Sequence, residues 1–401
     1  MRKIVLGLLT FISVSAVFGQ KTDPPRVFLL DGRVLLERRR AVLDPKTAPK
    51  YADTIKHLNS NAAKALKIEI LPVTSKQALP PSGDKHDYMS QAPYFWKNPD
   101  TKTGFPYIRR DGERNPEILQ YPDHGLMDDM VKTVDTLATA YFFTGKQEYA
   151  ARAATILRMW FLDQKTKMNP NLEFAQAIPG LNTGRGIGII ETHGLIRIVD
   201  AVGLLAGSEA WTKDGQSGLE SWFGKYVTWL TESKNGRDEA AAKNNHGTIY
   251  DVQVASFALF VGKTDLAKKL IESAKLNRIA KQFEPDGKQP LELERTKSWS
   301  YSTMNLGGFV ELAQLGDSIG IDLWSYQTND GRSIRKAFEY LVPFADGKKK
   351  WEYKQIEPLV GERLYSLIRK ARPKYKDEKF AAALASTPTL SAGDVGYLLL
   401  P

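Results

Sequence analysis

The chain contains no cysteine and only five histidines among its 401 residues. The absence of cysteine excludes disulfides, thiol catalysis and thiolate metal ligands, so a large core must stabilise the fold. Apolar residues make up 42% of the sequence and aromatic residues 10%, which permits such a core. No two histidines have the spacing of metal ligands and no carboxylates cluster at ligand spacing, so the sequence predicts neither a metal site nor a cofactor.

A long Lys/Arg block and a known nucleic-acid-binding motif are also lacking, although the formal net charge is +10. A positive charge favours an anionic partner, which means nucleic acid, a membrane surface or an acidic polysaccharide. The N-terminus has the form of an export signal, and export argues against nucleic acid. The sequence therefore predicts an anionic polysaccharide as the partner, and it leaves the oligomeric state open.

Residues 1–19 have the pattern of a signal peptide. Arg2 and Lys3 precede an apolar run at 4–16, and cleavage is expected near the small residue Gly19. The run is too short, and too soon followed by polar residues, to be a membrane span. We therefore expect a periplasmic or secreted protein with no stable membrane insertion after cleavage, and a single domain over residues 20–401.

Apolar residues at helical spacing surround two similar glycine turns, FTGK at 143–146 and FVGK at 260–263. A glycine at such a place ends one helix, and the next helix begins within a few residues. Alternation typical of strands is scarce. The sequence predicts an all-α fold, an α/α toroid (an incomplete barrel) with few or short strands. The expected antiparallel hairpins are 127–143 with 148–161, 196–230, and 306–344.

The stretch from 80 to 122 has no persistent period and is rich in proline, glycine and aromatic residues. Loops of this length in a compact domain are usually functional or disordered, and the aromatic residues argue against disorder. Tyr94 and Trp96 are suited to stack on sugar rings, while Arg109 and Arg110 are suited to hold carboxylates. We expect a substrate-covering loop at 80–115; a loop that merely covers the core is the equally weighted alternative.

A second irregular stretch, residues 168–192, carries several glycines, and polar residues of this stretch and its end are candidates for a cleft. It is not a phosphate-binding loop, because no Gly-Lys-Ser/Thr follows and the glycine spacing differs from the dinucleotide pattern. Asn182, Arg185 and His193 are the candidate ligand-binding residues, and Arg185 is preferred among them.

Lys243-Asn244-Asn245-His246-Gly247-Thr248 precedes an apolar run with helical spacing. The segment is therefore expected at a helix N-terminus, where unpaired backbone N–H groups favour an anion. The alternative is that an asparagine only caps the helix and His246 packs locally. Further along, residues 289–296 read as extended, and a helix is expected from Thr303. Taken alone, Arg295 is typical of a surface ion pair and Tyr301 of packing at a helix start.

Several segments together resemble the alginate lyase family of polysaccharide lyases. They are APYFWKNP, PYIRRDGERNPE, MNPNLEFAQAIPG, GRGIGIIET, KNNHGTIYDVQ and DGKQPLELERTKSWSYSTMNL, and the resemblance runs from about residue 60 to about 345. It implies an α/α toroid, which agrees with the expected hairpins, and a lyase acting on a polyuronate. By resemblance, Asn245, His246, Arg295 and Tyr301 take the family's catalytic positions, with Asn244 beside them in the substrate site.

The implied reaction is β-elimination, in which a base removes the C5 proton of a uronate and the C4–O bond breaks. Because the neighbouring carboxylate makes this proton weakly acidic, Asn245 and Arg295 would neutralise that carboxylate, and His246 would assist or act as base. Tyr301 would be acid and base in a syn elimination, which fits mannuronate or glucuronate, provided that nearby cations make its phenolate accessible. In an anti elimination, which fits guluronate, His246 would be base and Tyr301 acid.

Alginate containing mannuronate is the preferred substrate, because the resemblance is nearest there. A lyase of glucuronan or another glucuronate polymer is the first alternative, since both polymers present the same carboxylate. A glycoside hydrolase on the same helical toroid would need two facing carboxylates, for which only Asp87, Glu292 and Glu294 suggest themselves. A non-catalytic binder of acidic polysaccharide would need the aromatic and basic loop but no Tyr301 hydroxyl.

Overall fold

Helices make up most of the computed structural model, which describes residues 23–400 except 346 and 386. The predicted signal segment, residues 1–19, lies outside the described residues. No helix within the described ranges is both long and apolar enough to cross a membrane. The α-helices are α1 (Gly32–Leu43), α2 (Ala52–Ala65), α3 (Asp123–Thr144), α4 (Gln147–Phe161), α5 (Leu195–Leu205), α6 (Lys213–Glu232), α7 (Lys234–Ala240), α8 (Asn245–Phe260), α9 (Thr264–Ala274), α10 (Ala280–Gln282), α11 (Pro290–Leu293), α12 (Ser298–Ser318), α13 (Ile334–Ala345), α14 (Glu362–Ala371), α15 (Glu378–Ala385) and α16 (Gly396–Leu399).

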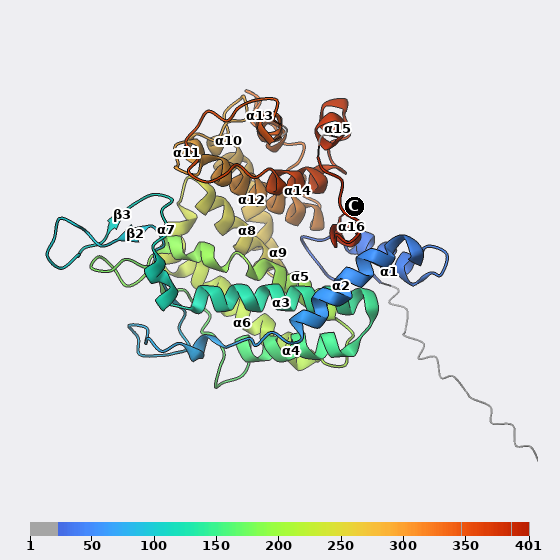
Figure 1. Ribbon diagram of the computed structural model, residues 1–401, viewed down its shortest axis with the longest axis horizontal. Coiled ribbons are helices and arrows are strands. Elements are labelled where there is room, and N and C mark those ends of the chain that lie inside the picture. Colours follow the sequence, from blue (N-terminus) through green and yellow to red (C-terminus); the bar gives the residue numbers. More distant parts are fainter. Residues whose placement is uncertain (1–22, 346, 386, 401) are drawn as a thin grey trace, which may run out of the picture.

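The larger helices form two layers. In the inner layer α3 packs on α5, α5 on α8, α8 on α12 and α12 on α14, while α4, α6, α9 and α13 pack against these helices as the outer layer. Figure 1 shows α3 and α4 in the lower part of the view, α5, α8 and α12 successively above them, and α13 at the top. The fold is an α/α toroid, as the sequence predicted.

Helix α8 lies at the centre of this arrangement and contacts α5, α6, α7, α9 and α12. Every residue of α8 is buried except His246, which follows the first residue of the helix. A helix with neighbours on all sides is largely apolar around its circumference, and the run from Ile249 to Phe260 has that character apart from the buried polar residues Asp251, Gln253 and Ser256. Burial therefore fixes α8 firmly and leaves one half-buried side chain at its N-terminal end.

The two glycine turns have the predicted role. Gly145 ends α3 with φ of 72°, and its N–H donates to the carbonyl of Tyr141. Gly262 has φ of 77° and separates α8 from α9. A residue with a side chain is strained in this left-handed region, so glycine allows each helix to end and the next to begin at once.

Strands are few and short, as expected. β1 (Met89–Gln91), β2 (Phe95–Trp96) and β3 (Ile108–Arg109) lie within the 80–115 segment, and β4 (Phe174–Ala177) lies within residues 168–192. β1 pairs in parallel with β4, and β2 pairs antiparallel with β3. The β2–β3 hairpin projects from the helices on the same side as α7 and α11 (Figure 1). The remaining turns of helix are η1 (Ala48–Tyr51), η2 (Val73–Ser75), η3 (Pro116–Gln120), η4 (Gly186–Thr192) and the π-helical η5 (Lys275–Ile279).

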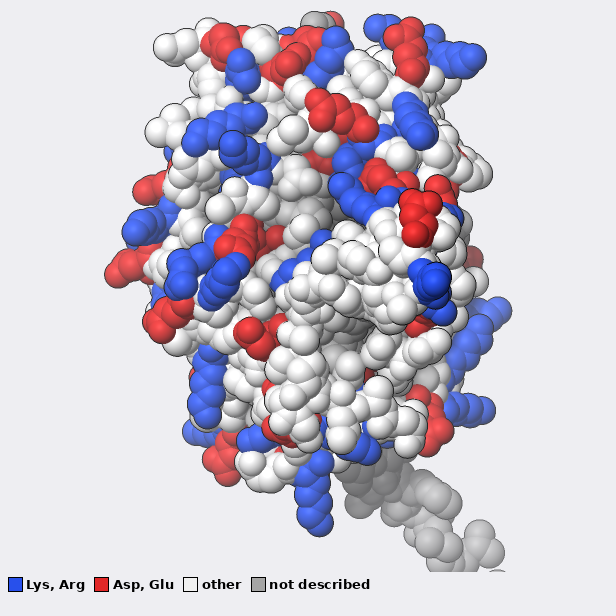
Figure 2. Space-filling view, turned by 90° about the vertical axis from the view of Figure 1, so that its left-hand side faces the viewer, with Lys and Arg blue, Asp and Glu red and all other residues white. Residues whose placement is uncertain are grey.

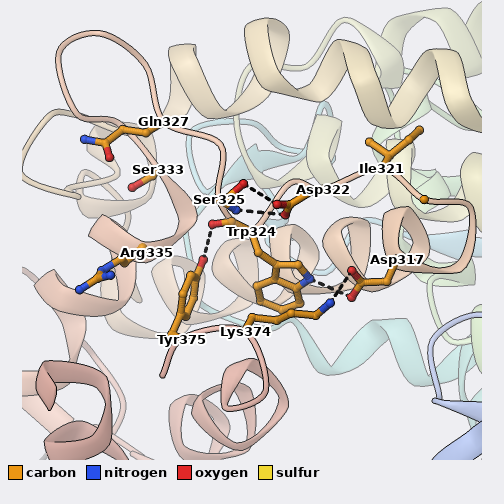
Figure 3. A pocket seen from close by; sticks show the side chains of 11 residues that line it. Asp317, Ile321, Asp322, Trp324, Ser325, Gln327, Ser333, Arg335, Lys374 and Tyr375 are labelled. Atoms are coloured by element: carbon orange, nitrogen blue, oxygen red, sulfur yellow. Dashed lines mark hydrogen bonds and ion pairs between the residues drawn. The ribbon is translucent and has the colours of Figure 1, made fainter. Parts of the chain in front are cut away.

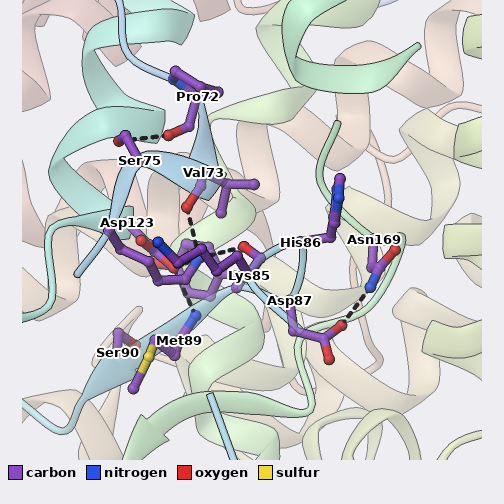
Figure 4. Close-up of polar contacts among 12 residues, drawn as sticks. Pro72, Val73, Ser75, Lys85, His86, Asp87, Met89, Ser90, Asp123 and Asn169 are labelled. Carbon is purple, nitrogen blue, oxygen red and sulfur yellow. Dashed lines mark hydrogen bonds and ion pairs between the residues drawn. The ribbon is translucent and has the colours of Figure 1, made fainter. Parts of the chain in front are cut away.

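A fully buried ion pair closes the base of the stretch from 80 to 122. The ammonium of Lys76 lies 2.8 Å from a carboxylate oxygen of Asp123 and donates to the carbonyls of Val73 and Lys85 at 2.7 and 3.0 Å (Figure 4). The same Asp123 oxygen accepts from the N–H of Met89 at 2.9 Å. Because breaking a buried pair leaves an uncompensated charge, this contact anchors both ends of the stretch to the start of α3.

The local structure of residues 289–303 differs from the sequence expectation. Residues 289–296 were expected to be extended, but they contain the helical turn α11. Pro290 occupies the first helical position, where its missing N–H costs nothing. Helix α12 begins at Ser298 rather than at Thr303, so Tyr301 lies in its first turn and its N–H donates to the carbonyl of Lys297.

Asp200 generates a prediction about stability and pH. Its carboxylate on α5 accepts the N–H groups of Phe28, Leu29 and Leu30, yet burial outweighs these bonds and raises its pKa to about 6. A raised carboxyl pKa means that the protonated form is favoured in the folded chain, so stability is present at acid pH and lost as the pH rises toward 6. We expect the wild type to lose about 3 kcal/mol between pH 4 and pH 7 relative to Asp200→Asn, which cannot ionise.

Urea denaturation of both proteins at the two pH values measures this difference. The Asn variant also loses backbone acceptors, but that loss is the same at both pH values and cancels in the comparison. Equal pH dependence in the two proteins would contradict the assignment.

Candidate functional site

His246 is oriented by a buried carboxylate. Its Nδ1 lies 2.6 Å from an oxygen of Glu239, which belongs to α7 and is 2% exposed. His246 itself keeps 16% of its side-chain surface exposed. The carboxylate holds the proton on Nδ1 and fixes the plane of the ring, so Nε2 is the nitrogen left for another partner.

The turn between α7 and α8 is held by Arg278. This buried guanidinium donates to the carbonyls of Ala240 and Ala242 at 2.8 and 2.7 Å, and it forms a two-point ion pair with Asp251 at 2.7 and 3.1 Å. A Cβ on Gly247 would lie only 2.1 Å from the carbonyl of Ala242. The glycine after His246 therefore permits the close approach that places His246 opposite Glu239, and Asp251 supports the turn rather than the cleft.

Asn245 is clamped by Glu292. Its backbone N–H and its Nδ2 donate to the two oxygens of Glu292 at 2.7 and 2.6 Å, and both residues are almost wholly buried. Burial raises the pKa of Glu292, and the two bonds from Asn245 oppose that shift. Glu292 is thus committed to α8 and does not face a cleft as a hydrolase carboxylate would. Asn245 has no exposed surface, so a ligand reaches it only if a neighbouring group moves.

Arg295 is held by Asp111 from the 80–115 segment. Its Nη2 lies 2.8 Å from Asp111 Oδ1, its Nε makes longer bonds of 3.2 and 3.3 Å, and Arg109 contacts the same carboxylate at 2.6 Å. The N–H of Thr296 also donates to Asp111. Burial acts to raise the pKa of Asp111, but the bonds from Arg295 and Thr296 outweigh it and hold that pKa well below the usual range.

Tyr301 lies against Arg295. The guanidinium carbon is 3.9 Å from the centre of the phenol ring, and the Tyr301 hydroxyl donates to the hydroxyl of Tyr94 at 2.9 Å. Burial raises the pKa of Tyr301 well above its ordinary value, the bond to Tyr94 adds to this, and only Arg295 opposes it. Cations were expected to make the phenolate accessible, whereas the structure shifts the pKa in the opposite direction and Tyr301 holds its proton.

Arg185 is a largely buried cation without a carboxylate partner among the described residues. Its Nη2 donates to the side chain of Gln176 at 2.8 Å, its guanidinium lies 5.1 Å from the ring centre of Phe95, and its buried Nε has no partner. Burial and the nearby Arg109 lower its pKa to about 10. Gln176 has a positive φ of 50°, which is strained for a residue with a side chain. An unpaired guanidinium held in this way is suited to an incoming carboxylate.

Electrostatic contacts connect these groups into one site. Glu292 is influenced by both Arg295 and His246, and Arg185 by both Arg109 and Glu239. The structure therefore brings together residues from α7, α8, α11, α12 and the irregular stretches. Figure 2, which views the side carrying the β2–β3 hairpin, shows a hollowed face with Lys and Arg side chains beside the hollow.

Trp96 and Arg110, predicted to contact substrate, pack on each other on the β2–β3 hairpin. The guanidinium of Arg110 lies 5.3 Å from the ring centre of Trp96, and the Trp96 indole N–H donates to the carbonyl of Glu113 at 2.9 Å. Arg110 remains 42% exposed in its side chain. In the contacts of the described residues, neither member of this pair touches His246, Arg295 or Tyr301.

The other predicted binding residues make local contacts. Asn182 is exposed and accepts the N–H of Ile178 at 3.1 Å, which shapes the turn before Arg185. His193 pairs with Glu311 of α12 at 2.8 Å. Asn244 occupies the N-cap position of α8 without a side-chain cap bond. None of these three contacts His246, Arg295 or Tyr301 in the hydrogen bonds of the described residues.

Sequence reasoning missed Glu239, Asp111 and Gln176 as members of the site. Glu239 precedes His246 by seven residues, and only the turn held by Arg278 brings them together. Asp111 and Arg295 are 184 residues apart. The acidic residue after two arginines in RRDG was the one available signal for Asp111.

A cavity of about 620 Å³ lies elsewhere, between α12, α13 and the chain after α14 (Figure 3). Both cations that line it are in ion pairs. Lys374 contacts Asp317 at 2.7 Å, and Arg335 contacts Asp377 at 2.9 Å and Glu339 at 3.1 Å. It therefore offers no free cation to an acidic ligand. Across the described ranges, no group of three His, Asp or Glu side chains is arranged to hold a metal ion.

Comparisons with known proteins agree with the fold. A protein-family model described as alginate lyase matches residues 72–351. Among solved structures, an alginate lyase from Bacteroides ovatus is 38% identical, covers 94% of this chain and 99% of its own, and has a TM-score of 0.88. A tetrasaccharide complex of alginate lyase A1-III, in a variant with one histidine replaced by alanine, is 15% identical with a TM-score of 0.59, covers 92% and 98%, and shows a common fold. No curated protein matches significantly.

Asp111 generates a prediction about the 80–115 segment. Asp111→Ala removes the anchor that joins this segment to Arg295 and Thr296, so we expect trypsin to cleave after Arg109, Arg110 or Arg114 several-fold faster than in the wild type. Limited proteolysis followed by mass spectrometry of the fragments measures the rate. Asp100→Ala in the same segment is the matched control, because Asp100 forms no ion pair in the described structure. Cleavage of Asp111→Ala at the control rate would contradict the anchoring role.

Proposed function

The chain belongs to the alginate lyase family and is a polysaccharide lyase, and we propose that it cleaves alginate containing mannuronate by β-elimination at the site of His246, Arg295 and Tyr301. The solved relatives named above are alginate lyases, and one binds a tetrasaccharide. Export of the chain stays a prediction, and it is consistent with a polymeric substrate outside the cell.

The contact between Arg295 and Tyr301 carries the proposal. A guanidinium 3.9 Å from the centre of a phenol ring puts a carboxylate-binding cation next to a proton donor. β-Elimination from a uronate needs this pairing, because the carboxylate must be neutralised while a proton reaches the glycosidic oxygen at C4. Asp111 occupies Nε and Nη2 of Arg295, and Nη1 makes no bond to the described residues, so Nη1 is the donor proposed to bind the carboxylate.

His246 and Asn245 are proposed to complete the neutralisation. Glu239 fixes the ring of His246 through Nδ1 and leaves Nε2 without a partner among the described residues, which supports a bond between Nε2 and the substrate carboxylate. Asn245 is proposed to act indirectly, by holding His246 in position. Glu292 accepts the side-chain amide and the backbone N–H of Asn245, and so fixes the backbone from which His246 extends. Direct contact between Asn245 and the carboxylate requires the Glu292 clamp to open.

Two proton routes are consistent with these contacts. Tyr301 holds its proton in the free protein, which supports its role as the acid that protonates the leaving oxygen in the anti route. In the syn route, the Tyr301 proton passes to Tyr94 while Tyr94 releases its own proton to solvent. The Tyr301 phenolate then removes the C5 proton and returns it to the leaving oxygen, and this route fits mannuronate. In the anti route, neutral His246 removes the C5 proton through Nε2, and this route fits guluronate.

Activity on defined polymers tests the function. We expect new ultraviolet absorbance from unsaturated chain ends with polymannuronate, a weaker signal with polyguluronate and with glucuronan, and the same rates with a chelator present. Tyr301→Phe should lower kcat by roughly 10²–10⁴-fold, because it removes the proposed proton donor. Tyr149→Phe, which removes a hydroxyl from the outer helix α4, is the matched control and should keep wild-type activity.

The outcomes separate the alternatives. A larger absorbance signal from glucuronan than from polymannuronate would mean that the substrate is a glucuronate polymer rather than alginate. New reducing ends without absorbance would indicate hydrolysis. Full activity in Tyr301→Phe would overturn the proton-transfer scheme, and loss of activity with chelator would overturn the proposed independence from metal.

Arg185 is proposed to bind a carboxylate of the polymer. Arg185→Met removes a charged hydrogen-bond donor from the site, so we expect KM for polymannuronate to rise roughly 10–100-fold with a smaller change in kcat. The melting temperature should not fall, because the substitution also removes an uncompensated buried cation.

Steady-state kinetics and thermal denaturation measure these two effects together. Arg152→Met on the outer helix α4 is the control, since Arg152 donates only to the carbonyl of Ile68 and should leave KM unchanged. An unchanged KM in Arg185→Met would exclude Arg185 from substrate binding, and a lower melting temperature would indicate a structural role instead.

A further inference from the structure

The first turn of α12, which carries Tyr301, lacks a cap of its own. Its N-cap residue Lys297 makes no side-chain cap bond. The first N–H groups of any helix have no acceptor within that helix, so they need one from elsewhere. Tyr301 is the fourth residue of α12, and its N–H makes one of the first intrahelical bonds, to the carbonyl of Lys297 at 3.0 Å. The direction of the phenol therefore depends on how this turn is held.

The missing acceptors come from a segment more than fifty residues later in the chain. The N–H of Ser298 donates to the carbonyl of Lys354 at 3.1 Å, and the N–H of Trp299 donates to the side-chain oxygen of Gln355 at 3.0 Å. The amide nitrogen of Gln355 donates in turn to the hydroxyl of Ser300 at 3.3 Å. The side chain of Gln355 thus caps α12 and contacts the residue directly before Tyr301.

Other contacts hold this later segment in place independently of the Gln355 side chain. The N–H of Ile356 donates to the carbonyl of Thr296 at 3.0 Å, and the indole N–H of Trp299 donates to the carbonyl of Val360 at 2.9 Å. The rings of Trp299 and Trp351 pack edge to face at 5.2 Å. Truncation of Gln355 would therefore remove the cap while the segment stays docked.

We propose that Gln355 is a positioning residue for Tyr301, so that the segment after residue 351 forms part of the reaction site. The family model ends at residue 351, and Gln355 lies beyond it. The inference rests on the proposed role of Tyr301, and it adds a residue that does not touch substrate. Gln355 acts by fixing the turn that keeps the Tyr301 hydroxyl near Tyr94 and the ring against Arg295.

Kinetics of Gln355→Ala test the proposal in the full chain. Misplacement of a reacting group by about 1 Å costs on the order of 100-fold in rate, so we expect kcat on polymannuronate to fall roughly 10–100-fold. KM should stay within about twofold of the wild type, because the groups proposed to bind the carboxylate are untouched. Gln355→Glu keeps an acceptor for the Trp299 N–H and places a favourable negative charge at the helix N-terminus, so kcat should recover to within about fivefold.

Thr212→Ala is the matched control for loss of a helix cap. Thr212 accepts the N–H of Gly215 at 3.2 Å and caps α6, an outer helix that carries none of the site residues. It should lower the melting temperature about as much as Gln355→Ala while leaving kcat unchanged. The proposal is overturned if Gln355→Ala keeps kcat within twofold, if Gln355→Glu does not recover kcat, or if Thr212→Ala loses as much kcat. Failure of the Tyr301 scheme would show separately, as activity retained in Tyr301→Phe.

Discussion

The clamp between Glu292 and Asn245 joins two parts of the chain on which the rest of the site depends. A carboxylate with almost no exposed surface meets the positive end of the buried helix α8 and accepts two hydrogen bonds there. Removal of either partner would leave a buried charge or buried donors unpaired, which is costly inside a protein. The clamp therefore fixes Arg295, three residues after Glu292, relative to His246, one residue after Asn245. Glu239 and Asp111 then orient His246 and Arg295 from further parts of the fold.

A site that is proposed to bind a polyanion contains a surprising number of carboxylates. Glu239 orients His246, Asp111 orients Arg295 and balances part of its charge, and Glu292 holds the buried Asn245. Arg185 differs, because its closest polar contact is the neutral amide of Gln176. Orientation and attraction are thus divided between residues: carboxylates hold His246 and Arg295 in position, whereas Arg185 keeps its charge for the proposed ligand.

The fold could be predicted from the sequence because its signals are local. Helical spacing of apolar residues and glycines at 145 and 262 depend on neighbours within a few positions, and the toroid followed from their repetition. Four site residues came from a resemblance, and their roles stay predictions. Glu239, Asp111 and Gln355 were missed because each meets its partner only through tertiary packing. The spacing of residues along the sequence carries no signal of such contacts. Residues 289–296 were expected to be extended, but Pro290 starts a helical turn there.

The raised pKa of Tyr301 restricts how the proposed reaction can begin. A phenol that is buried and bonded to a second phenol is a proton donor at rest, and Arg295 alone does not reverse that preference. In a syn elimination the base must therefore form after substrate enters, when Tyr301 passes its proton to Tyr94 and Tyr94 releases its own proton to solvent. Tyr94 belongs to the segment that Asp111 ties to Arg295, so the same anchor that orients the cation also keeps the proton acceptor in reach. The 80–115 segment and Arg295 are consequently joined, and displacing either would disturb the contacts of Tyr301 with Tyr94 and Arg295.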